Sequence, residues 1–259
     1  MCELFGFSSR LPTAATFSLR RFAARGGLEH RLIDGWGIAL ADETDLRLYR
    51  EPEPARDSAW IEFIEQRHIA SRFLISHIRH ATRGGVMLAN TQPFAREIGG
   101  RMHCFAHNGQ LDGIERLHAL ETGRFLPLGQ TDSERAACVL FERMAALWAQ
   151  SAPPPLAARL ETVNRFAAQL RDLGPANFLY CDGLTLFAHG HRRMQADGRI
   201  ASPGLWRLQR RCAADPDALR QAGVTLEVRG PSQQIELFAS VALTAEGWQP
   251  LAEGEVIAA

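Results

Sequence analysis

The sequence predicts an α+β fold, with antiparallel sheets that carry helices on their outer faces, in a single domain over residues 1–259. Strand-like runs dominate both ends of the chain, and helical periodicity is confined to the middle. An Asp182-Gly183 pair between two apolar runs is typical of a hairpin turn. Neither a GxGxxG motif nor a P-loop is present, so nothing indicates an alternating nucleotide-binding fold.

Short runs rich in β-branched and aromatic residues predict the strands. They lie at 2–7, 35–40, 45–50, 72–79, 102–107, 177–183 with 184–189, 226–230 and 235–240. Apolar residues recur at helical spacing over 137–148 and again over 156–173. Three consecutive prolines separate these two segments, and proline is excluded from helix interiors and central strands. We therefore expect a helical hairpin that turns at 151–156.

The composition excludes several classes of protein. Hydrophobic residues make up 46% and charged residues 22%, as in ordinary globular proteins. With 29 basic and 29 acidic residues, no excess charge favours nucleic acid or a membrane surface as partner. The five cysteines form no CxxC pair and are too scattered for a disulfide framework. No secretory leader and no run of about 18 apolar residues is present, so we expect a cytoplasmic protein.

Cys2 is the first candidate for chemistry. Methionine aminopeptidase removes Met1 when the second side chain is small, which would leave a thiol and a free α-amine on one residue. The two groups have ordinary pKa values of about 7.7–8.0 for the amine and about 8.5 for the thiol. Proton transfer between them is nearly balanced, so the amine can act as general base for the thiol. Taken alone, Cys2 is better explained as an incidental small apolar residue.

Three further segments carry polar groups that suit an amide substrate. Arg79 follows an apolar strand and offers a planar fork that fits a carboxylate, although a surface arginine paired with a nearby acid is the more common case. Asn108 and Gly109 supply the donor types of an oxyanion hole, although Asn-Gly is usually a turn. Asp132 could accept a bond from a substrate ammonium group. Thr131 and Glu134 around it fit a helix capping box, which is a complete structural explanation.

Four histidines invite a metal interpretation: His77, His80, His103 and His107. On an extended segment, the i, i+3 spacing of the first two directs their rings to opposite faces. None belongs to an HExxH motif. We therefore expect neither a metal nor another cofactor.

The joint order of the motifs is more specific than any one of them. After Cys2 come DGWGIAL (34–40), HIRHAT (77–82), NTQPF (90–94), AHNG (106–109) and TDSE (131–134). This series resembles the class II glutamine amidotransferase family, a branch of the N-terminal nucleophile (Ntn) hydrolases. The opening MCELFGFS, the RGG before DGWGIAL and the HNGQL segment are similar in particular to its stand-alone YafJ-like members.

The resemblance implies a fold and a role for each matching residue. The family fold is a four-layer α/β/β/α sandwich with two antiparallel sheets between helical layers. The implied catalytic residues are Cys2 as nucleophile, with its own α-amine as base, and Asn108 and Gly109 as the oxyanion hole. The implied substrate-binding residues are Arg79 for the α-carboxylate with Thr82 beside it, His107, and Asp132 for the α-ammonium. Trp36 and Gly37 match the strand that packs behind the nucleophile.

Three functions remain open from the sequence. The first is a hydrolase of glutamine or a γ-glutamyl amide, which acts through a thioester and releases ammonia or an amine. The second is a glutaminase subunit that passes ammonia to a separate synthase, because the implied fold leaves no room for a second domain. The third is a catalytically lapsed glutamine-binding regulatory protein. The substrate is a small molecule in each case, and the oligomeric state is not indicated.

Overall fold

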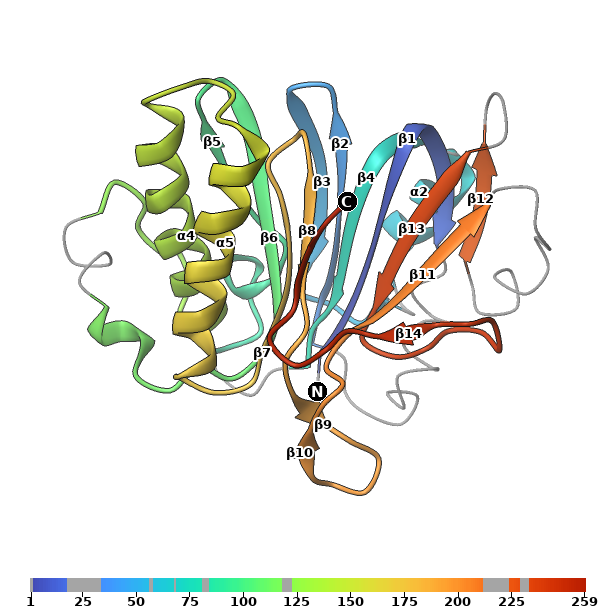
Figure 1. Ribbon diagram of the computed structural model, residues 1–259. Coiled ribbons are helices and arrows are strands. Elements are labelled where there is room, and N and C mark those ends of the chain that lie inside the picture. The colour runs from blue at the N-terminus through green and yellow to red at the C-terminus, as the bar shows by residue number, and fades with distance from the viewer. Residues whose placement is uncertain are drawn as a thin grey trace.

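The computed structural model describes residues 2–17, 34–55, 58–67, 69–80, 84–117, 123–211, 224–228 and 233–259. Two antiparallel sheets lie face to face in it (Figure 1). The large sheet has the order β14-β11-β13-β1-β4-β2-β3, and β12 also pairs with β1. Its strands are β1 (Glu3–Phe17), β2 (Trp36–Asp42), β3 (Asp45–Glu51), β4 (Ala70–Ile78), β11 (Trp206–Arg211), β12 (Val224–Val228), β13 (Gln234–Ala239) and β14 (Gln249–Pro250).

The small sheet has the order β15-β8-β7-β6-β5. Its strands are β5 (Phe94–Ile98), β6 (Arg101–Gly109), β7 (Ala176–Cys181), β8 (Leu186–His189) and β15 (Val256–Ala258). A separate hairpin of β9 (Arg193–Met194) and β10 (Ile200–Ala201) projects from one end of the molecule (Figure 1). Short 3-10 turns occupy Leu88–Asn90 and Ile114–Arg116.

Each strand contributes side chains to two packing layers, because successive residues of a strand point to opposite faces of the sheet. On β1, Leu4 lies between the two sheets, whereas Phe5 and Phe7 lie on the outer face of the large sheet. On β6, Cys104 and Ala106 lie between the sheets, and Phe105 faces the helices. Even-numbered residues of β1 and β6 therefore meet across the interface between the sheets.

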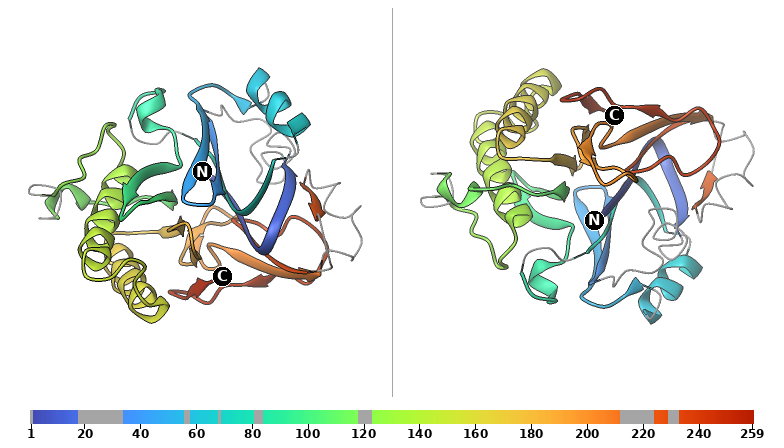
Figure 2. Two further views of the ribbon diagram at one scale, coloured as in Figure 1. Left: turned by 90° about the horizontal axis from the view of Figure 1, so that it is seen from above. Right: turned by 90° about the horizontal axis from the view of Figure 1, so that it is seen from below.

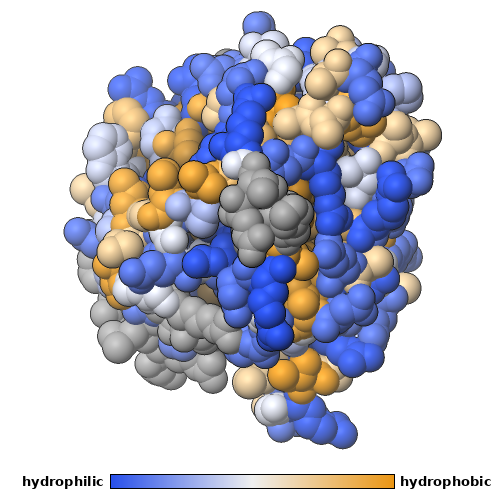
Figure 3. Space-filling view, turned by 90° about the vertical axis from the view of Figure 1, so that its left-hand side faces the viewer, coloured by the Kyte–Doolittle hydropathy of each residue, from blue (hydrophilic) through white to orange (hydrophobic). Residues whose placement is uncertain are grey.

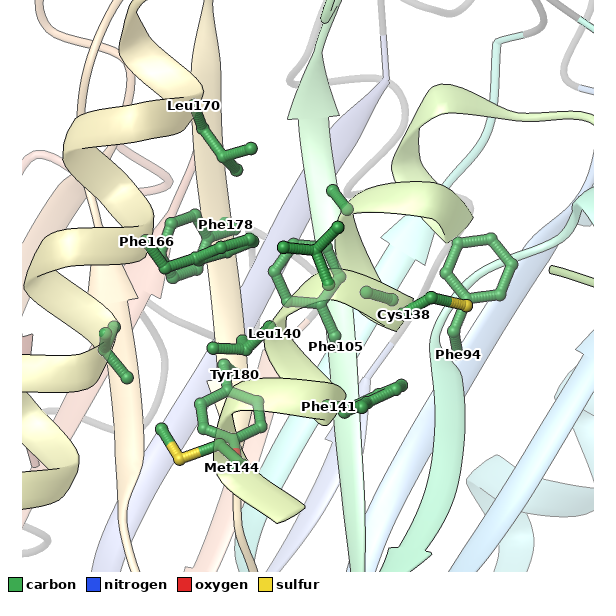
Figure 4. Close-up of a cluster of buried hydrophobic side chains, with 14 of the residues drawn as sticks. Phe94, Phe105, Cys138, Leu140, Phe141, Met144, Phe166, Leu170, Phe178 and Tyr180 are labelled. Carbon is green, nitrogen blue, oxygen red and sulfur yellow. The ribbon is translucent and has the colours of Figure 1, made fainter. Parts of the chain in front are cut away.

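Helices cover both outer faces. Helices α4 (Asp132–Trp148) and α5 (Leu156–Arg171) pack on the small sheet, and the views along the sheets show them side by side there (Figure 2). Ten side chains of the buried cluster between them and the small sheet are labelled in Figure 4: Phe94, Phe105, Cys138, Leu140, Phe141, Met144, Phe166, Leu170, Phe178 and Tyr180. The outer face of the large sheet packs against α2 (Ala59–Arg67) through Ile61 and Ile64. The α+β four-layer sandwich is thus confirmed.

The expected helical hairpin is present as α4 and α5, and each expected strand run overlaps an observed strand. The hairpin expected at Asp182-Gly183 is also present, because β7 pairs with β8. Their connection spans residues 182–185, where the Asp182 carboxylate accepts bonds from Leu184 N and Thr185 N, both 2.9 Å. The capping box is half formed, because Thr131 Oγ1 accepts from Glu134 N (3.1 Å) while the Glu134 carboxylate binds Gly129 N and Arg96 instead. No helix in the described ranges has the length and apolarity needed to cross a membrane.

Candidate active site

Cys2 lies at the start of the central strand of the large sheet. Strand β1 runs between β4 and β13, and Glu3 pairs with Ile78 at the end of β4. The thiol is half-buried beside His80, whose N–H donates to Sγ over 3.3 Å and whose carbonyl lies 3.5 Å from Sγ. Strand pairing therefore fixes the thiol next to the segment that follows β4.

A cavity of about 270 Å³ opens beside the thiol. Cys2, Asn108 and Gly109 all line it, although 106 residues separate the first two in sequence. The other lining residues come from four further segments: His80, Gln110, Pro175, Arg192, Arg193, Met194 and Ile200. The structure thus brings the three predicted catalytic residues to one solvent-accessible space.

Asn108 contacts Cys2 directly. As an even-numbered residue of β6 it points between the sheets, where its Nδ2 donates to Cys2 O over 2.8 Å and to Ser240 Oγ over 3.4 Å. Its own carbonyl accepts from Asn177 Nδ2 on β7 (3.0 Å). Asn108 is therefore buried, with its side-chain amide bonded to Cys2 and Ser240 and its backbone carbonyl bonded to β7.

Only glycine fits at position 109. A Cβ atom there would lie 1.8 Å from Pro175 O and 2.8 Å from His107 Nε2. Strand pairing of Gly109 with Ala176 brings the β7 backbone this close. The backbone of Gly109 consequently faces the cavity without a side chain over it.

Arg79 is buried, and it is not one of the described residues that line the cavity. Its backbone N–H donates to Gly35 O (2.8 Å), and its Nη2 donates to Gly84 O (3.2 Å). This burial contradicts the alternative interpretation of Arg79 as a surface arginine in an exposed ion pair. Thr82, predicted beside it, lies outside the described residues.

Asp132 and His107 are not among the described residues that line the cavity. Asp132 begins α4, and its carboxylate accepts bonds from Leu111 N (2.8 Å) and Ser133 N (2.9 Å). His107 faces the helical layer, where its Nδ1 lies 2.9 Å from Ser133 Oγ.

Trp36 and Gly37 lie on β2, which pairs with β4 rather than with β1. They are therefore one strand away from the nucleophile strand. A Cβ at Gly37 would lie 2.1 Å from Gln92 O, so this glycine admits the Gln92 backbone. The Gln92 side chain then bridges the sheets, with Nε2 3.2 Å from His77 Nε2 and 3.0 Å from His107 O.

Burial dominates the protonation of the groups around Cys2. It raises the pKa of the Cys2 thiol, and the His80 N–H bond opposes this only in part. Burial also raises the pKa of Glu3 to about 7 against the opposing effect of Arg193. It lowers the pKa of His77 to about 3. The thiol therefore rests in its neutral form and needs a base to become a nucleophile.

The sequence did not reveal an ion pair next to the nucleophile. Glu3 and Arg193 are both buried, and Arg193 Nη2 lies 2.8 Å from Glu3 Oε1. Arg193 Nη1 also donates to Ser240 O, and Ser240 Oγ accepts from Leu4 N (2.9 Å). These partners are 190 and 47 residues apart in sequence, so no local pattern announces them. The turn of the β9–β10 hairpin did carry a signal, Asp197-Gly198, in which Gly198 adopts a φ of 82°.

Metal ligation finds no geometric support in the ranges that the structure describes. No group of three or more His, Cys, Asp or Glu side chains in them could hold a metal ion. His103 Nδ1 lies 2.6 Å from the Tyr180 hydroxyl, and His77 contacts Gln92. These two histidines thus contact separate partners in different parts of the molecule.

Comparison with known proteins identifies the family. A model of the class II glutamine amidotransferases matches residues 1–259. A candidate glutamine amidotransferase of Escherichia coli K12, YafJ, is 34% identical over 98% of this chain and 96% of its own. The crystal structure of a predicted glutamine amidotransferase from Pseudomonas aeruginosa is 31% identical, with a TM-score of 0.72 over 99% of this chain and 96% of that one.

A more distant structure supports the fold alone. The glutamine phosphoribosylpyrophosphate amidotransferase of Bacillus subtilis is 18% identical, with a TM-score of 0.53 over 98% of this chain and 49% of that one. The family model, the full-length relative and the two-sheet sandwich agree. The chain belongs to the class II glutamine amidotransferase family, with the fold of the Ntn hydrolases.

Proposed function

We propose that this protein hydrolyses the side-chain amide of glutamine or of a γ-glutamyl compound, with Cys2 as an N-terminal nucleophile. The observation that carries the proposal is the convergence of Cys2, Asn108 and Gly109 on one cavity. A thiol next to an amide donor and an uncovered backbone is the arrangement that acyl transfer requires.

The reaction begins once Met1 has been removed. The freed α-amine takes the thiol proton, which the raised pKa of Cys2 makes necessary. Sulfur attacks the amide carbon and forms a tetrahedral intermediate. The C–N bond then breaks, the α-ammonium returns its proton to the leaving nitrogen, and a γ-glutamyl thioester remains. Water cleaves the C–S bond, which restores the thiol and yields a free carboxylate.

The oxyanion of the intermediate would bind Asn108 and the backbone at Gly109. One Nδ2 hydrogen of Asn108 is committed to Cys2 O at 2.8 Å, whereas the bond to Ser240 is longer, at 3.4 Å. The weaker bond is the one that we expect to exchange for the oxyanion. Loss of one such donor typically costs about 3–4 kcal/mol of barrier, or a factor of about 100–1,000 in rate.

Arg79 and Asp132 would hold the two ends of the amino acid. Arg79 presents a bidentate donor for the α-carboxylate, and Thr82 follows it closely in sequence. Oδ2 of Asp132 accepts from Leu111 N alone and keeps a lone pair for the substrate ammonium, whereas Oδ1 accepts from both N and Oγ of Ser133. His107 contacts Ser133 and would support the substrate through the start of α4.

A release assay with matched variants tests the proposal. Intact mass should show the loss of Met1, and 6-diazo-5-oxo-norleucine should add a single adduct at Cys2. Ammonia or amine release should vanish in Cys2→Ala and persist in Cys138→Ala, because Cys138 is buried in the helical layer away from the cavity. Full activity in a chain that keeps Met1 would refute the mechanism.

An apolar surface favours a second candidate, a glutaminase subunit for a separate synthase. Two loops expose Val86, Met87, Leu88, Leu126 and Leu128. The bond from Gln130 N to Asn90 Oδ1 (2.7 Å) ties these loops together, and exposed apolar groups of this kind mark protein contacts. A rise in glutaminase turnover with a co-purifying synthase would favour this role. Glutamine binding with no turnover in any preparation would instead indicate a lapsed regulatory protein.

A further inference from the structure

The cavity beside Cys2 is larger than the leaving group of glutamine requires. Ammonia is about the size of water, whose share of liquid volume is about 30 Å³, whereas the cavity measures about 270 Å³. Arg79 and Asp132, the groups assigned to the amino acid, are not among its described lining residues. With the γ-glutamyl moiety held by those two groups, the space beside the thiol is available to the departing nitrogen and its substituent.

Three apolar residues line this space. Pro175, Met194 and Ile200 line it, and the last two are 45% and 56% exposed. Ile200 is the direct cross-strand partner of Met194, so both side chains lie on one face of the β9–β10 hairpin. Figure 3 shows this hairpin projecting below the body with apolar surface. A ligand in the cavity would bury apolar area on that face.

The hairpin is a built element with its own bonds. Gln195 N donates to Arg199 O over 2.8 Å across the turn. The Gln195 side chain donates to Ala201 O (2.7 Å) and Pro203 O (3.1 Å). These bonds fix the apolar face toward the cavity before any ligand arrives, which lowers the entropy that binding costs.

The two arginines of the cavity already have carboxylate partners. Arg192 lies 2.6 Å from Glu253, and Arg193 lies 2.8 Å from Glu3. Both guanidinium groups therefore already bind carboxyl groups of the protein, and an acidic leaving group would have to compete with these partners. The wall accordingly favours an uncharged, apolar leaving group over the carboxylate of a γ-glutamyl peptide.

We propose that Pro175, Met194 and Ile200 form a subsite for the apolar amine that leaves from a γ-glutamyl alkylamide. This inference rests on the proposed amide hydrolysis and names its substrate class. In the first step the C–N bond of the amide breaks as the C–S bond forms. The departing alkylamine takes the proton held by the α-amine of Cys2, and water later cleaves the thioester.

The test compares kcat/KM for L-glutamine, γ-glutamyl methylamide, γ-glutamyl propylamide and γ-glutamylglycine. Each buried methylene is expected to raise kcat/KM about fourfold, so propylamide should exceed methylamide about 15-fold. γ-Glutamylglycine, similar in length to propylamide but anionic, should fall below it. The variants Met194→Ser and Ile200→Ser should each flatten the dependence on chain length. Leu156→Ser, a control at an exposed apolar position on α5, should keep it.

The outcomes separate this inference from the function on which it rests. Glutamine turnover with equal kcat/KM for all amides, or with γ-glutamylglycine preferred, would overturn the apolar subsite and leave the hydrolase intact. Failure of wild type to turn over any of the four compounds would overturn both. Thermal unfolding of each variant shows whether it has folded, and Met194→Leu, which keeps the apolar surface, should retain the slope if either serine variant is unstable.

Discussion

Gly109→Ala should disable the site through one steric contact. The added Cβ would lie 1.8 Å from Pro175 O, and ordinary van der Waals contact begins at 3.4 Å, so the β6 and β7 backbones must separate by about 1.6 Å at this point. Gly109 ends β6 and pairs with Ala176 of β7, and Pro175 directly precedes that partner, so the clash is with backbone and no flexible side chain can yield instead. Overpacking of this kind typically costs about 1–3 kcal/mol of stability.

The same shift would reach the nucleophile. Asn108, the preceding residue, holds Cys2 O at 2.8 Å, and a displacement of 1 Å at a reacting centre can reduce the rate about 100-fold. We expect kcat/KM for amide release to fall at least about 100-fold, with a lower melting temperature. Gly247→Ala is the matched control, because no atom lies within 4 Å of its Cβ position. A Gly109→Ala protein with wild-type melting and more than a tenth of the activity would refute the steric argument.

Three further changes have signs that the structure fixes. Arg79→Lys should raise KM for glutamine about 10–100-fold with a smaller effect on kcat, because lysine loses the bidentate fork; an unchanged KM would remove Arg79 from the substrate site. Because the pKa of His77 is lowered to about 3, this residue stays neutral at pH 5 in the folded protein, whereas it becomes protonated in the unfolded chain. Acidification from pH 7.5 to 5 should therefore lower the free energy of unfolding by about 2 kcal/mol in wild type, and His77→Gln should lack this loss. Glu3 has the opposite sign. Its pKa is raised to about 7, so the folded protein holds the carboxyl proton more tightly than the unfolded chain does. The stability that results is complete below about pH 4.5 and is lost as the pH rises through 7, which amounts to about 3 kcal/mol between pH 5 and 8. Urea unfolding of Glu3→Gln and wild type at pH 5 and pH 8 measures this difference. The same change in the free energy of unfolding with pH in both proteins would contradict the burial of the carboxylate.

Local periodicity was sufficient to predict most of the fold. Strands such as β4 and β13 and the helices on either side of the three prolines each carry their signal within a few residues. The β9–β10 hairpin was missed although Asp197-Gly198 is a hairpin signal, because its strands have only two residues each. The strand pattern cannot find such short elements.

The site was predicted by motif order rather than by geometry. No property of residues 2 and 108 alone indicates that they touch, because their contact depends on which faces of two sheets are opposed. The resemblance supplied that pairing, but it could not supply the Glu3–Arg193 pair or the apolar wall. Both depend on residues near 193–200, well beyond the last matched motif at 131–134.

The ion pair explains how the wall of the cavity is held against the nucleophile. A buried pair of this kind is often no more stable than two apolar side chains, so its value lies in the geometry that it imposes. Arg193 begins β9, and its guanidinium contacts both Glu3, next to Cys2, and the carbonyl of Ser240 at the end of β13. The hydroxyl of Ser240 accepts bonds from Leu4 N and from Nδ2 of Asn108. One buried network therefore joins β1, Asn108 and the base of the hairpin, and it fixes the position of the hairpin face relative to the Cys2 thiol.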